Sequence, residues 1–118
     1  MTDRDIKELR GYVKGFAKLE ESFAAIESEV VKTHLPTVRK VLNASRQAMQ
    51  FPVVRMAIEV DDPDEATVRI AAHKIASVLA LNGISNIAKA LTEIALEEAR
   101  YHGEREFAKI RDRHKKGA

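Results

Sequence analysis

His73 is the residue of this chain whose type and surroundings best suit chemistry. Four small residues lie one or two helical turns from it on the same side, namely Ala66, Ala76, Ser77 and Ala80. An exposed helix face is normally filled with long charged side chains, whereas small residues leave an imidazole accessible to a reaction partner. We interpret this face as one that presents a surface nucleophile. The alternative is a histidine without function on a face that packs against another helix.

The helix that carries His73 is expected to begin at the stretch DDPDEA. Asp62 is the predicted N-cap, Pro63 suits the first turn, and the acidic residues that follow complement the helix dipole. The helix should run to about Leu81 and stop at the C-cap pair Asn82–Gly83. His73 lies nearly opposite the centre of its apolar half on the helical wheel. That half comprises Val68, Ala71, Ala72, Ile75, Val78, Leu79 and Asn82.

Other segments of the chain also show helical periodicity. Gaps of three and four between apolar residues predict a long first helix over Asp3–Lys32, although Gly11 and Gly15 weaken its first half. Its apolar stripe comprises Ile6, Leu9, Val13, Phe16, Leu19, Phe23, Ile26 and Val30. Pro36 is expected to open a second helix, and Pro52 to kink or interrupt it.

The end of the chain completes the predicted fold. Ser85 is the predicted N-cap of a helix that ends at Gly103, and a basic helix and tail follow over residues 104–118. Short connections predict antiparallel neighbours. We therefore expect an all-α, antiparallel up-and-down four-helix bundle with a long N-terminal helical segment, forming a single domain over residues 1–118. The residues that should be buried together are Val68, Ile75, Leu79, Ile87 and Leu91.

The composition narrows the function classes. The chain has 118 residues, a net charge of +2 and no cysteine, which excludes disulfides, thiol catalysis and cysteine metal sites. Its charged start, MTDRDIKELR, is not a signal peptide, and no apolar run is long enough to cross a bilayer. We therefore expect a cytoplasmic protein without a membrane partner. A net charge this small does not by itself indicate nucleic-acid binding.

The stretch from Asp64 to Gly103 resembles a histidine-containing phosphotransfer (HPt) domain. Members of that family carry an alanine–histidine pair, an apolar residue two positions after the histidine, and a glycine ten positions after it. A leucine–glutamate pair, and then a small residue with arginine before another glycine, come later. The matching residues here are Ala72, His73, Ile75 and Gly83, followed by Leu96, Glu97, Ala99, Arg100 and Gly103.

The resemblance implies a phosphoryl carrier in a two-component phosphorelay rather than an enzyme with its own substrate pocket. His73 would exchange a phosphoryl group with the aspartate of a response-regulator receiver domain, or accept it from a hybrid histidine kinase. The receiver would contribute the magnesium, so no cofactor or metal belongs to this chain itself. The surface on which the receiver would dock comprises Ala66, Ile70, Ala76 and Ala80.

Two positions depart from the family's pattern. The lysine usually found three residues after the histidine is Ala76 here, and the glycine four residues after it is Ser77. That lysine is thought to help hold the phosphoryl group, so efficient transfer needs a substitute. Arg69, one turn before His73, is the best placed cation, whereas Lys74 points about 100° away around the helix. Ser77 could donate a hydrogen bond to a phosphoryl oxygen.

Other interpretations remain open at this point. The chain could be a non-catalytic helical interaction module, or a degenerate HPt-like adaptor that binds a partner without phosphate exchange. The apolar stripe of residues 6–30 could bury itself in the bundle or pair with a second copy, giving a homodimer through the N-terminal helix. A nucleic-acid accessory role would use Arg105–Lys116. Glu98 and His102 have the spacing of two metal ligands, but such a pair is more often an ion pair.

Overall fold

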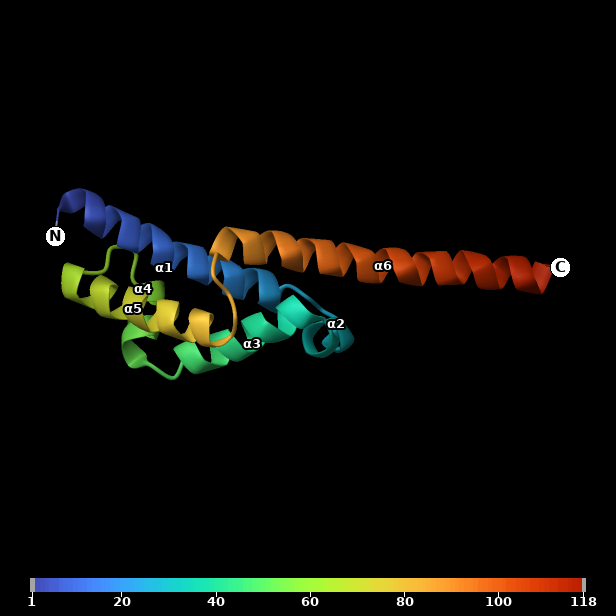
Figure 1. The fold of residues 1–118 in the computed structure, drawn as a ribbon, viewed down its shortest axis with the longest axis horizontal. Coiled ribbons are helices and arrows are strands. Elements are labelled where there is room, and N and C mark those ends of the chain that lie inside the picture. The colour runs from blue at the N-terminus through green and yellow to red at the C-terminus, as the bar shows by residue number, and fades with distance from the viewer. Residues whose placement is uncertain (1, 118) are drawn as a thin grey trace.

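The computed structural model describes the backbone of residues 2–117 and the side chains of residues 2–113. Within that range the chain is all-helical, without a strand, which confirms the predicted all-α class (Figure 1). No helix in this range has both the length and the apolar character that crossing a membrane requires. The helices are α1 (Asp3–Ala24), α2 (Glu29–His34), α3 (Pro36–Ala48), α4 (Pro52–Glu59), α5 (Glu65–Leu81) and α6 (Ile87–Gly117).

Proline and glycine set three of the helix boundaries where the sequence predicts them. Pro36 is the first residue of α3 and Pro52 the first residue of α4, positions at which the missing N–H of proline costs nothing. Gly83 follows the end of α5 with a φ of 74°. This left-handed backbone favours glycine, so Gly83 terminates α5 as expected.

The predicted first helix over Asp3–Lys32 is wrong at its C-terminal end. α1 runs without a break through Gly11 and Gly15 but stops at Ala24. A new helix, α2, then starts because the side chain of Ser28 accepts a hydrogen bond from the backbone N–H of Val31. A local cap therefore overrides an apolar periodicity that continues across the break.

α6 corrects two further boundaries. The side chain of Asn86, rather than that of Ser85, caps the helix start by accepting a hydrogen bond from the N–H of Lys89 at 3.0 Å. The helix then continues through Gly103 to Gly117, where the sequence predicted a break and a separate last helix. A glycine inside a helix costs about 1 kcal/mol relative to alanine, which the strong helix formers around Gly103 offset.

The predicted antiparallel four-helix bundle is not confirmed. Figure 1 shows α5 beside the first and larger part of α1 and the start of α6 beside its last part, all three running in the same direction. α5 and α6 therefore follow one another along α1 and are not packed side by side. This arrangement is allowed because α1, with 22 residues, is longer than α5, with 17. Ile87 at the start of α6 lies 3.7 Å from the position that a Cβ on Gly15 would occupy.

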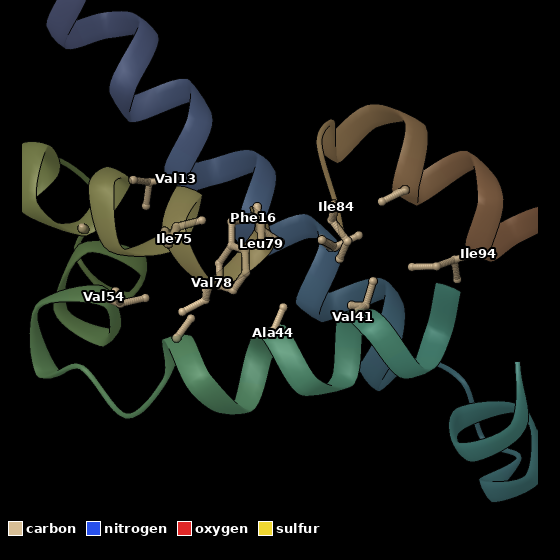
Figure 2. Packing of buried hydrophobic residues seen from close by; sticks show 14 of the residues in the cluster. Val13, Phe16, Val41, Ala44, Val54, Ile75, Val78, Leu79, Ile84 and Ile94 are labelled. Carbon is tan, nitrogen blue, oxygen red and sulfur yellow. The ribbon is translucent and has the colours of Figure 1, made fainter. Parts of the chain in front are cut away.

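The hydrophobic core lies where α1, α3 and α5 meet, and it continues to α4 and to the start of α6 (Figure 2). Phe16 and Leu19 of α1 are completely buried. Of the five residues predicted to be buried together, Val68, Ile75 and Leu79 are buried. The other two, Ile87 and Leu91, are only partly buried and pack against the edge of the core.

The start of α3 is capped by a side chain from α6. Its own N-cap residue, Leu35, offers no side-chain hydrogen bond. Instead the backbone N–H of Thr37 donates to both carboxylate oxygens of Glu97 at 3.2 Å, and the Thr37 hydroxyl donates to Glu93 at 3.3 Å. A carboxylate at a helix N-terminus satisfies a free N–H and complements the dipole. Because Thr37 is buried, this contact ties α6 to the body of the protein.

We expect Glu97→Ala to lower the free energy of unfolding by about 1–2 kcal/mol, because it leaves the buried N–H of Thr37 without a partner. Glu97→Gln, which retains one acceptor oxygen, should lose less. Urea denaturation followed by circular dichroism measures both. Glu104→Ala, an exposed glutamate farther along the same helix, is the matched control. Equal stabilities for the Glu97 and Glu104 variants would contradict the capping role.

Candidate functional site

His73 lies in the middle of α5 with its side chain exposed, as the helical wheel predicted. The opposite side of the helix is buried against α1, α3 and α4. The buried residues of α5 are Val68, Ala71, Ala72, Ile75, Val78 and Leu79. Because these apolar side chains must face the core, the rotation of α5 about its own axis is set, and that rotation points His73 outward.

The start of α5 is capped by Asp64, not by Asp62 as the sequence predicted. The Asp64 carboxylate accepts the backbone N–H of Thr67 at 2.8 Å. Hydrogen bonds from the backbone N–H and the side chain of Thr67 lower the pKa of Asp64 below its usual range. Since the folded state lowers this pKa, the cap contributes stability at neutral pH, and that contribution is lost as acid protonates the carboxylate.

Asp62 has a different role in the loop before α5. Arg10 of α1 reaches this loop with its guanidinium, where Nη1 lies 3.1 Å from Oδ1 of Asp62. Its Nη2 donates a hydrogen bond to the backbone oxygen of Pro63 at 2.9 Å. Arg10 therefore holds the start of α5 against α1 and helps to position the helix that carries His73.

A hollow of about 870 Å³ opens beside His73, between α1 and α5. Leu9 and Tyr12 of α1 form one wall. Burial raises the pKa of Tyr12, so its phenol stays neutral and can donate a hydrogen bond. The other wall comes from α5 and comprises Ala66, Arg69, Ile70, Ala72, His73, Lys74 and Ala76.

The small and apolar residues predicted to form a docking surface are all exposed, but they are not all at the hollow. Ala66, Ile70 and Ala76 line it together with His73. The side chain of Ile70 is 51% exposed, which is high for a large apolar residue. Ala80 is exposed farther along α5 and does not line the hollow. Accessible small residues therefore lie on α5 both before and after His73.

The three residues predicted to support a phosphoryl group differ in their engagement. Arg69 is exposed beside His73, and no carboxylate in residues 2–113 forms an ion pair with it. The Lys74 ammonium lies 4.7 Å from the centre of the Phe51 ring, a cation–π contact. The Ser77 hydroxyl donates to the backbone oxygen of His73 at 2.9 Å. The guanidinium of Arg69 is therefore the charged group of this site that can bind an anionic ligand without breaking an ion pair with a described carboxylate.

Two residues of the hollow were missed by the sequence analysis. Leu9 was predicted only as part of the apolar stripe of the first helix, which could be buried in the bundle or pair with a second copy, and Tyr12 was not singled out. Both lie at the edge of the buried face of α1 and become neighbours of His73 only because α1 and α5 run side by side in the same direction. A tyrosine at the border of an apolar stripe is the signal that could have indicated a rim position.

The remaining histidines of the described part of the chain do not form a metal site. No group of three or more histidine or acidic side chains among the described residues is arranged to hold a metal ion. Nε2 of His102 lies 3.7 Å from a carboxylate oxygen of Glu98, which is the ion-pair geometry expected from their spacing. The side chain of His114 lies outside the described residues.

We expect diethyl pyrocarbonate, which acylates accessible imidazoles, to modify His73 readily, and Ala76→Trp to slow that reaction by filling the hollow. Ala80→Trp is the matched control because it adds the same side chain to the same helix outside the hollow. Both positions are exposed, so neither change should cost much stability. Peptide mass spectrometry measures the rate at His73. The same rate in both variants would show that Ala76 does not border the route to the imidazole.

Comparisons with protein-family models, with curated proteins and with solved structures returned no match to this chain. The case for a function therefore rests on the residues around His73 and on their geometry.

Proposed function

We propose that this protein is a cytoplasmic histidine phosphotransfer carrier that exchanges a phosphoryl group with a response-regulator receiver domain or a hybrid histidine kinase. The observation that carries the proposal is the exposed imidazole of His73, in the middle of a well-anchored helix, at the edge of a hollow lined by small and apolar residues. A phosphoryl carrier needs a nucleophile that a folded partner can reach. The resemblance of residues 64–103 to HPt domains supports the same function.

The chemistry is a displacement at phosphorus. A neutral imidazole nitrogen of His73 attacks the phosphorus of the partner's aspartyl phosphate. The new P–N bond forms as the P–O bond to aspartate breaks, and the carboxylate leaves with the bonding electron pair. The remaining ring proton is then available for hydrogen bonding or release.

Arg69 supplies the positive charge in this proposal. A guanidinium one turn before the imidazole can form charge-assisted hydrogen bonds to phosphoryl oxygens. The family's usual lysine would stand at position 76, where this chain has alanine. Lys74 and Ser77 are already engaged with Phe51 and with the backbone of His73, so they would have to leave these contacts to assist.

The proposal keeps the histidine-bearing helix of the family but does not depend on its up-and-down four-helix bundle. Transfer requires an exposed imidazole on a rigid helix and room for the receiver. α5 is anchored by its buried face, by the Asp64 cap and by the contacts of Arg10. The receiver would cover Ala66, Ile70 and Ala76, and it would extend toward Ala80.

A non-catalytic adaptor is the second candidate. Leu9, Tyr12 and Ile70 give the hollow an apolar surface that would bind a partner without any phosphate exchange. The alanine at position 76 also agrees with a domain that has kept the docking surface and lost transfer. The two candidates differ in whether His73 becomes phosphorylated.

The decisive experiment is incubation with phosphorylated receiver domains from the same organism, following the label onto this chain. We expect acid-labile phosphate on the wild-type protein and none on His73→Gln, because a phosphorylated imidazole hydrolyses in acid. His102→Gln, which changes an exposed histidine away from the hollow, should be labelled like wild type. Binding of receivers without labelling would favour the adaptor, and neither binding nor labelling would refute both.

If Arg69 holds the phosphoryl group, Arg69→Ala should slow labelling of His73 by roughly tenfold or more, since a charge-assisted hydrogen bond is worth about 1.5–3 kcal/mol. Ala76→Lys should raise transfer in the wild-type background and restore it in Arg69→Ala. Arg55→Ala, an exposed arginine on α4, is the control. Thermal unfolding should be unchanged in each variant. If neither substitution changes the rate at which His73 is labelled, Arg69 has no role in the mechanism, and His73 remains the acceptor.

A further inference from the structure

One apolar surface of the protein is not used by the fold or by the site at His73. The apolar stripe of the N-terminal helix is one candidate for self-association, but much of it is buried within the chain, at Val13, Phe16 and Leu19. The outer side of α6 is not. There Leu96 is 50% exposed, Phe107 66% and Ile110 50%.

These exposed residues share one face of α6. Leu96, Gly103 and Ile110 recur at intervals of seven residues, which is two helical turns, and Phe107 lies one turn beyond Gly103. The opposite face, which includes Ile94, packs against the body of the protein. Figure 1 shows the second half of α6 projecting beyond the other helices. α6 thus carries an apolar seam with the period of a coiled coil on its solvent side.

We propose that this seam binds α6 of a second copy of the chain, antiparallel, with the two helices crossing at Gly103. Gly103 is the midpoint of the seam, since Leu96 and Ile110 lie equally far on either side of it. A two-fold axis through Gly103 therefore places Leu96 of each copy opposite Ile110 of the other. Such self-complementary pairing is the usual form of a symmetric dimer.

The charge distribution along α6 selects the antiparallel orientation. Residues 87–102 of the helix carry three acidic and two basic side chains, whereas residues 103–113 carry four basic and three acidic ones, with the cations Lys109, Arg111 and Arg113 near the end. An antiparallel pair sets this basic end of each copy beside the half of the other α6 that carries Glu93, Glu97 and Glu98, of which Glu93 and Glu97 also accept hydrogen bonds from Thr37. A parallel pair would set basic beside basic, which is unfavourable.

Gly103 also permits a close approach of the two helices. A Cβ at this position would meet nothing within 4 Å in the single chain, so the fold does not require glycine there. Its backbone is helical and has no need of a positive φ. A glycine that weakens an exposed helix is explained if the partner helix packs directly onto its backbone.

The body of the protein leaves room for this partner. It packs on the inner face of α6 and along the first part of that helix (Figure 1). A second α6 on the outer face would carry its own body at the opposite end and on the far side. The proposal is independent of phosphate chemistry at His73.

Sedimentation equilibrium on the whole chain tests the proposal. We expect a species of twice the 13.2 kDa chain mass. Gly103→Leu should raise the dissociation constant at least about tenfold, although leucine is the better helix former and should raise the helical content of α6. Gly11→Leu is the matched control, because a Cβ at exposed Gly11 also meets nothing within 4 Å. A monomer at all concentrations up to the millimolar range would overturn the proposal.

Ile110→Asp provides an independent variant, since this residue lies on the projecting part of α6 and its substitution should leave the fold intact. It should also convert the dimer to a monomer. If the protein forms a dimer whose dissociation constant changes with neither Gly103→Leu nor Ile110→Asp, the assignment of the dimer surface to this seam is wrong.

The orientation can be tested by cross-linking because the chain has no cysteine. Copies with Leu96→Cys are mixed with copies with Ile110→Cys and oxidised. We expect disulfides between the two kinds of copy, whereas disulfides within each kind alone would overturn the antiparallel arrangement. A monomer that binds polynucleotide with a steep salt dependence would instead assign the basic end to nucleic acid and would also overturn the proposal.

Discussion

The structure depends on the burial of one face of α1, which serves as the shared support of two helices that follow one another. Phe16 and Leu19 are completely buried, and a 22-residue helix is about 33 Å long, enough for α5, about 25 Å long, to lie along most of it and for the start of α6 to lie along the rest. Because α5 must turn its aliphatic face toward α1, its opposite face is necessarily open to solvent. The exposure of His73 is thus a consequence of core packing and costs the fold nothing.

Several features of the fold could be predicted from single residues, and the reasons are local. Pro36 and Pro52 set helix starts because proline lacks an N–H, and Gly83 sets a helix end because its φ is positive. Two predicted caps were displaced to nearby residues, from Asp62 to Asp64 and from Ser85 to Asn86. In each case neighbouring residues have side chains of equal capping ability, so propensity cannot choose between them.

The relative placement of helices could not be predicted in this way. Short connections suggested antiparallel neighbours, but the loop after Gly83 leads α6 onward along α1. That choice is made by contacts distant in sequence, such as Ile87 beside Gly15 and Glu97 on Thr37. The same limit applies to the candidate site. The outward direction of His73 follows from the periodicity of one helix, whereas Tyr12 joins it only through tertiary packing.

The capping of α3 by α6 links two parts of the protein that the loops alone would leave independent. The N–H of Thr37 has its acceptor on α6, so any opening that lifts α6 from the body exposes this amide and frees the start of α3 at the same moment. Elements coupled in this way open as one cooperative unit, and their amides exchange with solvent at a common rate. The amide proton of Thr37 is therefore a natural reporter on whether α6 is docked, even though it belongs to a different helix.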